Sequence, residues 1–372
     1  SAPVMAGGGA AQELEVWRAN LRELLQVSPA AESSVECAES FAEMFVRVHE
    51  REIEQRRHAG LVRDVHGDLR CEHVLVVPTV RIVDRIEFDP SLRHTDIACD
   101  LAFLAMDLEA LGQRHGAERL LASYRASGMD AGSDALLSFH GAHRALVRAK
   151  VASIGAAEHA DERGAALSAQ AASMLLLATR LCWRARGPVA IVVCGPSASG
   201  KSTLAAELAR RSGLEVLSSD AVRKSAAGLQ PTDRAAPEHY SHHFTHHVYE
   251  LLAGEARARI SAGRGVIVDA TCRSRVERST LLGRLARTGV PRLVVRCVVP
   301  LEVALRRAAA RTHDPLRVSD ADPQIVAEQY RSFQALEELP PEDVLELDTQ
   351  PPLDVQVGRV THALDRLLSL LE

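Results

Sequence analysis

The stretch "VAIVVCGPSASGKSTLAAELA", residues 189–209, decides the fold of the second half of this chain of 372 residues. It joins an apolar run of β-type residues to a loop rich in glycine and serine, and then to an alanine-rich run of helical character. Gly195, Gly200, Lys201 and Ser202 match the pattern G-x-x-x-x-G-K-[ST], which requires a strand before it and a helix after it. In such a loop, backbone N–H groups and the positive end of the helix point at bound phosphates. The sequence therefore predicts a phosphate-binding loop.

The loop also predicts a nucleotide and its metal ion. The Lys201 ammonium would reach the β- and γ-phosphates as a catalytic group, and the Ser202 hydroxyl would coordinate Mg²⁺. ATP and Mg²⁺ are therefore the expected cofactors. A chance match in a chain rich in alanine, glycine and serine is the alternative. The residues expected to bind ATP are Gly195, Pro196, Ser197, Ala198, Ser199, Gly200, Lys201, Ser202 and Thr203.

The sequence around this loop alternates between strand and helix patterns. Apolar β-type runs at residues 189–194, 214–218, 266–269, 293–299 and 344–347 are separated by helix-like segments. Strands that are apolar throughout are typical of a parallel sheet covered by helices on both faces. We therefore expect an α/β domain over residues 188–372, with a five-stranded parallel sheet between helices.

The residues before Pro188 have a different pattern. They are mostly helical, with two helices expected between residues 134 and 184 and two short strands in residues 73–84, around a turn at Pro78 and Thr79. We expect a flexible tail over residues 1–19 and a mostly helical domain over residues 20–184. A chain of this length is long enough for two domains, each with its own core.

The composition limits the class of protein. Apolar residues make up 47% and charged residues 25% of the chain, as in ordinary globular proteins. The net charge of −5 provides no basic field that would favour nucleic acid, although a local groove is compatible with it. The seven cysteines are scattered without a C-x-x-C pair, and no apolar run reaches the roughly 18 residues of a membrane span. We expect a cytoplasmic protein with no membrane partner, and the sequence leaves its oligomeric state open.

Polar residues follow the second and third predicted strands, at the edge where ligands bind in parallel sheets. Asp220 follows the second strand and could accept a proton from an attacking hydroxyl, and Arg223 lies one helical turn further on. Asp269 ends the third strand and Thr271 lies just after it, and Asp269 could hold Mg²⁺ directly or through water. These residues favour transfer of a phosphoryl group to the hydroxyl of a small molecule.

An arginine-rich segment follows the fourth predicted strand. Arginines that close over a transferring phosphoryl group stabilise its negative charge and exclude water. A solvated helix face is the alternative for each arginine taken singly. The segment carries Arg306, Arg307, Arg311 and Arg317.

Residues 188–348 resemble the P-loop kinases of small substrates, a group that includes gluconate kinase, chloramphenicol phosphotransferase, polynucleotide kinase and zeta toxin. The resemblance rests on the segments "GPSASGKST", "SSDAVRK", "VIVDAT" and "LELDT", in this order. It implies that Asp220 is the base for the substrate hydroxyl and that Arg223 contacts the substrate. Thr271, which the strand pattern places at the same edge of the sheet, is a further candidate for contact with the substrate. It also implies that Arg307 and Arg311 belong to a catalytic lid. The resemblance does not identify the acceptor, because the substrate pocket is what differs among these enzymes.

The first half carries the segments "VHGDLRCEHVLVV" (residues 65–77) and "IVDRIEFDPSLRHTDIACDLAFLAMDL" (residues 82–108). His66 and Asp68 resemble the catalytic loop of aminoglycoside phosphotransferases, which share the protein-kinase fold. Asp84 resembles their metal-binding aspartate, and Asp100 the aspartate that supports the catalytic loop. Together the two halves resemble the bifunctional aminoglycoside phosphotransferase/ATP-binding protein family of bacteria over about residues 30–350.

The first half departs from the protein-kinase pattern in two ways. His73 stands where that scheme has an asparagine that binds Mg²⁺, and imidazole suits softer metals. The scheme also needs a lysine from an N-terminal lobe, whereas the lysines of this chain are Lys150, Lys201 and Lys224. We expect a kinase-like C-lobe without its ATP-clamping partner, in which the aspartates serve as a structural platform. Phosphotransfer by this half to an aminoglycoside-like sugar is the alternative.

A group of histidines lies in the segment "EHYSHHFTHHVYE". Their spacing places them on one face of a helix that Ser241 could cap. Histidines four residues apart can bind Zn²⁺, but no cysteine lies nearby, so we expect a polar stripe on the surface or facing the substrate. The group consists of His239, His242, His243, His246 and His247.

The sequence therefore favours an ATP- and Mg²⁺-dependent kinase whose chemistry lies in residues 188–372. An ATP-binding regulatory or scaffold protein is a rival interpretation, in which a degenerate kinase-like half senses a ligand and the P-loop half switches. A kinase of polynucleotide 5′-hydroxyls is a further alternative. Dependence of ADP release on an added acceptor distinguishes the enzymes from the regulatory protein.

Overall fold

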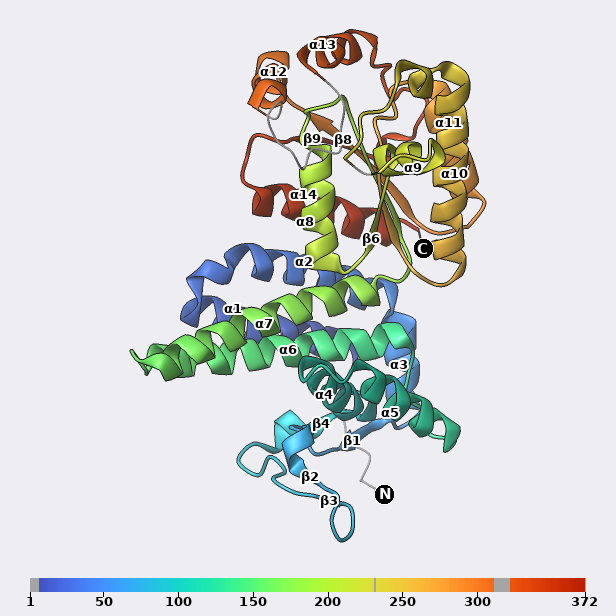
Figure 1. Ribbon diagram of the computed structural model, residues 1–372. Helices are drawn as coiled ribbons and strands as arrows, with labels where there is room; N and C mark the ends of the chain where they lie inside the picture. The colour runs from blue at the N-terminus through green and yellow to red at the C-terminus, as the bar shows by residue number, and fades with distance from the viewer. Residues whose placement is uncertain (1–6, 231, 311–321, 372) are drawn as a thin grey trace. The chain divides into compact units, whose positions relative to one another are not determined.

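The computed structural model describes residues 7–230, 232–310 and 322–371 of the chain. The chain divides into two compact units, one that ends at Arg186 and one over Gly187–Leu371 (Figure 1). Each unit has its own secondary structure and core, and each is described separately.

The first unit is mostly helical. The two helices expected between residues 134 and 184 are confirmed as α6 and α7, which pack along each other. Ser133 caps α6 by accepting a hydrogen bond from the Leu136 N–H, and Asp161 caps α7 in the same way. The helices are α1 (Ala10–Val27), α2 (Glu32–Val48), α3 (Glu50–His58), α4 (Ile97–Ala110), α5 (Arg114–Ala126), α6 (Asp134–Ala157) and α7 (Glu162–Ala185).

Aromatic rings form the core of the first unit. Phe139 of α6 stacks on Trp17 of α1 and on Phe45 of α2, with ring centroids 4.9 Å and 4.3 Å apart. Such rings bury large apolar areas in defined geometries. A buried ion pair adds a fixed point, because the Arg56 guanidinium donates to both oxygens of Asp96 at 2.7 and 2.8 Å. This pair joins α3 to the start of α4, which Asp96 caps.

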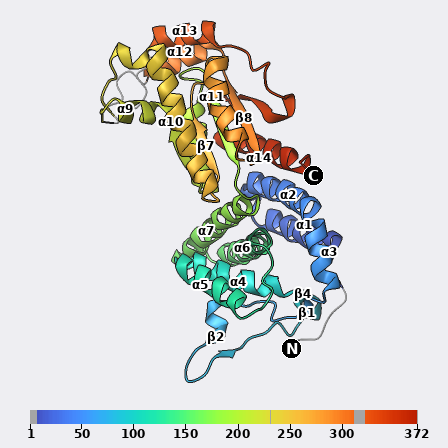
Figure 2. The ribbon, with the colours of Figure 1, turned by 90° about the vertical axis from the view of Figure 1, so that its right-hand side faces the viewer.

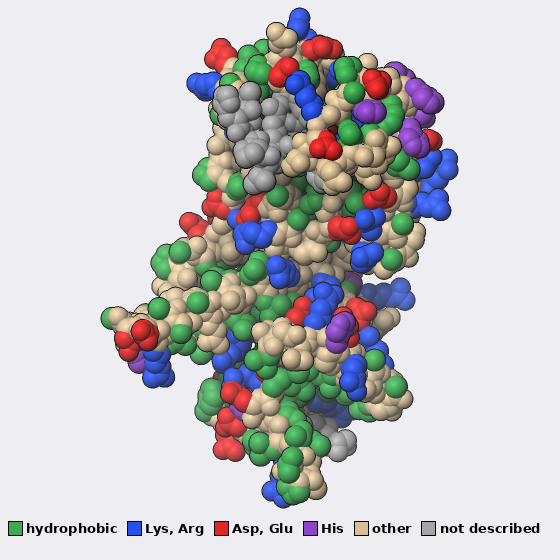
Figure 3. Space-filling model, viewed as in Figure 1, with side chains coloured by type: hydrophobic (Ala, Val, Ile, Leu, Met, Phe, Trp, Pro, Cys, Tyr) green, Lys and Arg blue, Asp and Glu red, His purple; other side chains and the backbone are tan. Residues whose placement is uncertain are grey.

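Two small antiparallel pairs of strands complete the first unit. β1 (Val62–Asp64) pairs with β4 (His94–Asp96), and β2 (Val74–Leu75) pairs with β3 (Arg81–Ile82). The hairpin predicted within residues 73–84 is thus confirmed. Its tip is apolar and exposed: Val77 is 82% exposed and Val80 is 70% exposed. Figure 3 shows hydrophobic side chains gathered on the surface around this hairpin.

Among the described residues, α7 is long and apolar enough to cross a membrane, judged by length and composition alone. Core helices of globular proteins meet the same criteria. α7 packs along α6, and some of its apolar side chains are buried within the first unit.

The second unit contains a five-stranded parallel sheet, as predicted. Its strands lie in the order β6-β7-β5-β8-β9, and every neighbouring pair is parallel. Each strand begins and ends within one residue of its expected bounds. All residues of β5 and β7 are buried, because helices cover both faces of the sheet. The strands are β5 (Ala190–Cys194), β6 (Glu215–Ser218), β7 (Val266–Asp269), β8 (Arg292–Val298) and β9 (Val344–Asp348).

The helices of the second unit form two layers around this sheet (Figures 1 and 2). α10 and α11 cover one face, and α8 and α14 cover the other. β5 lies at the centre of the sheet, and the chain continues to β6 and β7 on one side of it and to β8 and β9 on the other. In sheets of this kind, ligands bind at the carboxyl ends of the strands, where the strand order reverses. The helices are α8 (Lys201–Ser212), α9 (Ser219–Ala226), α10 (His242–Ser261), α11 (Arg275–Ala286), α12 (Leu301–Ala310), α13 (Pro323–Ser332) and α14 (Leu353–Ser369).

Candidate active site

The predicted phosphate loop lies between β5 and α8, at the carboxyl edge of the sheet. Gly195, Ala198 and Gly200 have positive φ angles of 137°, 64° and 94°. A side chain at Gly195 would place its Cβ 2.7 Å from the Cys297 carbonyl oxygen, and one at Gly200 would lie 2.9 Å from Thr349 Oγ1. Glycine is therefore required at both positions. A backbone of this kind turns successive N–H groups towards one concave side, where an anion can bind.

The residues at the start of α8 extend this anion site. Lys201 is the first residue of α8 and is buried, whereas Ser202 and Thr203 are exposed. Ser199 is also buried, and its Oγ has no hydrogen-bond partner among the described residues. Buried polar atoms without a partner are costly unless a ligand or water satisfies them. The loop thus has the shape, the positive charge and the unsatisfied groups expected of a phosphate site.

Asp269 ends β7 beside the loop and is 6% exposed. Burial raises the pKa of its carboxyl, whereas the charge of Lys201 and a hydrogen bond from Ser202 lower it and the charge of Asp220 raises it. The structure therefore brings together Asp269, Lys201, Ser202 and Asp220, which come from different positions in the sequence. Asp269 Oδ1 has no hydrogen-bond partner within the part of the chain that the structure describes.

The oxygen set at this point fits a magnesium ion. Asp269 Oδ1 and the Ser202 hydroxyl are hard oxygen ligands of the kind that Mg²⁺ prefers. Within the part of the chain that the structure describes, no group of three or more His, Cys, Asp or Glu side chains could hold a metal by itself. Mg²⁺ generally keeps several waters and takes further oxygens from phosphates, so a site with two protein oxygens is typical of a metal that arrives with its nucleotide.

Asp220 and Arg223 lie one turn apart on α9, directly after β6. Asp220 is partly exposed, whereas Arg223 is buried. Arg223 Nη1 donates to the His239 carbonyl oxygen at 2.5 Å and to Thr245 Oγ1 at 3.3 Å. Its guanidinium also lies over the Tyr240 ring, 4.7 Å from the centroid. Arg223 therefore holds the segment before α10 in place. Its Nε has no hydrogen-bond partner among residues 7–230, 232–310 and 322–371.

Thr271 contributes a backbone contact to the loop. Its carbonyl oxygen accepts a hydrogen bond from the Gly195 N–H at 3.2 Å. The side chain of Thr271 is partly buried at the same edge of the sheet. Contact between this side chain and a substrate stays a prediction.

Two residues of the site were missed by the sequence analysis. The Thr349 hydroxyl, directly after β9, donates to the Ser199 carbonyl oxygen at 2.6 Å. Gln329 of α13 accepts a hydrogen bond from the Ser197 N–H at 2.7 Å. Thr349 could have been found from its place after the fifth predicted strand, in the segment "LELDT". Gln329 has no comparable signal, because no strand end or motif marks α13.

Arg307 of α12 reaches the loop through Thr349. Its Nη1 donates to Thr349 Oγ1 at 3.0 Å and its Nη2 to the Thr349 carbonyl oxygen at 2.9 Å. Its positive charge therefore lies behind the phosphate loop. Arg306 is exposed on the same helix, and Arg311 and Arg317 lie outside the described residues.

The histidine group does not lie on a single helix, contrary to the prediction. His239 belongs to a short 3₁₀ helix (Pro237–Tyr240), and α10 begins only at His242. The break arises because Ser241 caps α10: its side chain accepts a hydrogen bond from the Phe244 N–H, as predicted. His242, His243, His246 and His247 are exposed on the surface of the second unit, where Figure 3 shows histidine side chains gathered.

The structure also brings the predicted residues of the first unit together. Asp100 of α4 accepts hydrogen bonds from the backbone N–H groups of His66 and Gly67, at 2.6 and 2.9 Å. Burial raises the pKa of Asp100, and these two hydrogen bonds lower it. Asp100 thus holds the loop before Asp68 in place.

The other two aspartates of this group, Asp68 and Asp84, contact Arg70 and His73. Arg70 Nη2 donates to Asp68 Oδ2 at 2.9 Å. His73 contacts the Asp68 carbonyl oxygen through Nδ1 at 2.7 Å and Asp84 Oδ2 through Nε2 at 3.2 Å. The imidazole therefore lies between Asp68 and Asp84, in the place where the kinase pattern has a metal-binding asparagine.

Comparisons with known proteins give one family model and several relatives of this chain. A family model described as an AAA domain matches residues 191–336. Uncharacterized proteins of Mycobacterium bovis and Mycobacterium tuberculosis are 30% identical over 353 residues, which cover 93% of this chain and 68% of each relative. The chain belongs to their family.

The second unit is also similar to solved small-molecule kinases. A sugar kinase from Janibacter sp. HTCC2649 is 26% identical, with a TM-score of 0.36 over 48% of this chain and 95% of its own. A gluconokinase from Sinorhizobium meliloti 1021 is 20% identical, with a TM-score of 0.35 over 48% and 93%. The APS kinase of Mycobacterium tuberculosis is 22% identical, with a TM-score of 0.36 over 48% and 98%. The resemblance of the first unit to aminoglycoside phosphotransferases stays a prediction.

Proposed function

We propose that this member of the family is an ATP- and Mg²⁺-dependent phosphotransferase, which moves the γ-phosphoryl group of ATP to a hydroxyl of a small molecule such as a sugar. The observation that carries the proposal is the unpartnered Oδ1 of buried Asp269 beside Lys201 and Ser202, at the mouth of a loop in the phosphate-binding conformation. An ATP–Mg²⁺ complex would supply the partners that these groups lack. The chemistry would lie in the second unit.

Each residue of the site has a role in this reaction. The loop N–H groups and the Lys201 ammonium would bind the phosphate oxygens, and Ser202 and Asp269 would hold the metal ion. Asp220, the partly exposed carboxylate of the group, would accept the proton of the acceptor hydroxyl. The acceptor oxygen then forms a bond to the γ-phosphorus as the bond to the bridging oxygen breaks, and ADP leaves.

The surroundings of Asp220 support a polar acceptor. Arg223 braces the segment that carries His239 and Tyr240, and α10 presents the N–H groups of its first turn next to this segment. We propose that the acceptor binds between this segment and the side chain of Thr271. Arg307 would stabilise the transferring charge from behind the loop.

The contacts of Asp68 argue against phosphotransfer in the first unit. A general base needs a free carboxylate within reach of the acceptor, whereas Asp68 is paired with Arg70. His73 fills the position between Asp68 and Asp84. We propose that this group of residues is a structural platform in the first unit.

Acceptor-dependent release of ADP tests the proposal. Sugars, aminoglycosides, nucleotides and oligonucleotides with a 5′-hydroxyl are incubated with the full chain, ATP and Mg²⁺, and ADP is measured. We expect at least one class to stimulate release in the wild-type chain and not in Lys201→Ala. Tight ATP binding with no stimulation by any class would contradict a kinase and favour an ATP-binding regulatory protein.

A further inference from the structure

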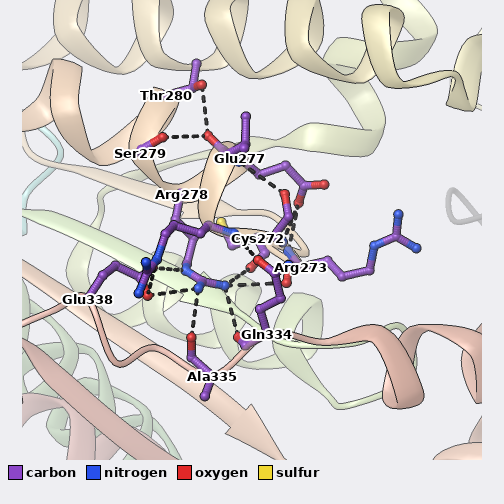
Figure 4. A network of polar contacts seen from close by, with 12 residues as sticks. Cys272, Arg273, Glu277, Arg278, Ser279, Thr280, Gln334, Ala335 and Glu338 are labelled. Carbon is purple, nitrogen blue, oxygen red and sulfur yellow. Dashed lines mark hydrogen bonds and ion pairs between the residues drawn. The ribbon is translucent and has the colours of Figure 1, made fainter.

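Arg278 of α11 is the most densely bonded buried arginine of the second unit among the described residues, and the chemistry proposed above does not use it. Its side chain is 1% exposed. Figure 4 shows its guanidinium between two segments that lie far apart in the sequence. Nη1 donates to the carbonyl oxygens of Cys272 and Gln334, at 3.1 Å each, and Nη2 donates to that of Ala335 at 2.8 Å.

The other hydrogen bonds of the Arg278 guanidinium are with Arg273 and Glu338. Nη1 also approaches the Arg273 carbonyl oxygen at 3.4 Å. Glu338 accepts from Nε through Oε1 and from Nη2 through Oε2, the latter at 3.1 Å. The hydrogen bond from Arg278 lowers the pKa of Glu338, so the carboxylate stays charged opposite the guanidinium. These hydrogen bonds fix the orientation of the planar guanidinium, and the Glu338 carboxylate balances its charge.

Two further hydrogen bonds join the same segments. The Gln334 N–H donates to the Arg273 carbonyl oxygen at 2.9 Å, and Gln334 Oε1 accepts from the Arg275 N–H at 2.7 Å. The segment after β7 and the segment after α13 are therefore held together, with Arg278 at the centre of the contact.

Both of these segments reach the phosphate loop, each at a different residue. The segment after β7 contains Thr271, whose carbonyl oxygen accepts from the Gly195 N–H. The segment after α13 directly follows the helix that carries Gln329, whose side chain accepts from the Ser197 N–H. These two contacts fix the first half of the loop, whereas Thr349 fixes Ser199 in its second half.

We propose that Arg278 is a positioning residue for nucleotide binding: it ties the segment after β7 to the segment after α13 and so holds Thr271 and Gln329 against the phosphate loop. The proposal rests on the ATP site proposed above. A loop that is already ordered before ATP arrives binds it more tightly, because less conformational entropy is lost on binding.

The test is a double-mutant cycle read by ATP affinity. Arg278→Lys keeps the charge but loses the fork of donors, and Gln329→Ala removes the contact with Ser197. We expect each variant to weaken binding of ATP–Mg²⁺ about tenfold in calorimetric titrations, and the double variant to lose little more than either one. Arg284→Lys is the matched control: it lies on the same helix and pairs with Glu250, away from the loop, and should bind ATP as wild type does.

A purely structural role gives a different result. In that case Arg278→Lys lowers the melting temperature, yet its folded fraction binds ATP within twofold of wild type, or its effect adds fully to that of Gln329→Ala. Either outcome overturns the proposal. If Arg278→Lys does not fold, Glu338→Gln tests the same tie, and unchanged ATP affinity in that variant overturns it too. ATP binding without phosphotransfer would contradict the proposed function but leave this inference standing.

Discussion

Asp220 lies just after β6 and Asp269 ends the neighbouring strand β7, yet their surroundings differ. Asp269 is buried with an unpartnered oxygen, and Asp220 is partly exposed at the start of α9. A buried carboxylate next to Lys201 is suited to hold a cation, whereas one open to solvent can exchange a proton with an acceptor. At the scale of single residues, these surroundings support the proposal that Asp269 binds the metal ion and Asp220 acts as the base.

Asp220→Asn should separate ATP binding from phosphotransfer. The amide keeps the shape and one hydrogen-bonding oxygen but loses the charge and the basicity. General-base assistance is worth about 10²–10⁴-fold in rate, or about 3–5 kcal/mol. We expect transfer to slow at least about a hundredfold, with ATP affinity within about threefold of wild type. Full transfer by the asparagine variant would show that Asp220 is not the base, and a parallel loss of ATP affinity would indicate a metal-binding role.

Lys201→Ala should abolish nucleotide turnover, because the other lysines lie outside the phosphate loop. Asp84→Ala should leave turnover largely intact, since the ion pair of Asp84 is with His73, within the first unit. Lys150→Ala, which loses an exposed pair with Glu23, is the matched control for the loss of a lysine. The measurement is ADP release with each variant shown to be folded by circular dichroism. Transfer that survives Lys201→Ala and stops in Asp84→Ala would place the chemistry in the first unit.

At the scale of elements, the strands of the second unit could be predicted because each is a short β-type run in which apolar residues predominate, although Glu215, Arg296 and Glu346 interrupt three of these runs. The loop from Gly195 to Gly200 could be predicted because its backbone geometry requires glycine at fixed positions. Gln329 could not be predicted, since its role comes from the tertiary position of α13. His239 was assigned to α10 because the spacing of the histidines fits one helix, but the Ser241 cap starts that helix only at His242.

A double variant of α10 tests whether histidines four residues apart on a helix bind a metal ion here. His242→Gln combined with His246→Gln should change neither metal content nor ATP affinity, because these side chains are exposed and no group of three ligands forms among the described residues. Metal content is measured by mass spectrometry on protein purified without a metal column. Stoichiometric zinc that is lost in the double variant would contradict this expectation.

Glu13 of α1 should make the stability of the first unit depend on pH. Burial raises the pKa of its carboxyl to about 7, against an ordinary value of 4.5, and His140 of α6 lies 3.9 Å away. A raised pKa in the folded state stabilises the fold below pH 4.5, and this contribution is lost as the pH rises through 7. Glu13→Gln removes the cost of ionising the buried group. It should raise the free energy of unfolding of the first unit by about 3 kcal/mol at pH 8 and by little at pH 5.

Urea unfolding followed by tryptophan fluorescence measures this effect. Both tryptophans, Trp17 and Trp183, lie in the first unit and are buried, so their emission reports this unit alone. The control is Glu15→Gln, an exposed residue of α1 that pairs with Arg22. A gain in stability that is equal at pH 5 and pH 8 would show that Glu13 ionises normally in the fold.

At the scale of the whole molecule, the hairpin β2–β3 is the main exposed apolar feature of the described surface. Exposed apolar strands with free edges favour association between chains. We expect Val77→Lys combined with Val80→Lys to raise the protein concentration at which light scattering detects association. Val355→Lys, at an isolated exposed valine of α14, is the control and should have no effect. Equal association of the wild type and the double variant would show that the hairpin does not drive it.

Because Thr349 contacts the phosphate loop, the proposed nucleotide site is completed late in synthesis of the chain. Its hydroxyl supports the Ser199 carbonyl, yet the ribosome adds Thr349 long after the loop itself has been made. At a typical elongation rate of about 5–20 residues per second, the chain waits roughly 7–30 s between Lys201 and Thr349. During this interval the loop lacks β9 and the anchor for Arg307. A nascent chain should therefore be unable to hold ATP until its last strand has joined the sheet, while the first unit is already free to fold.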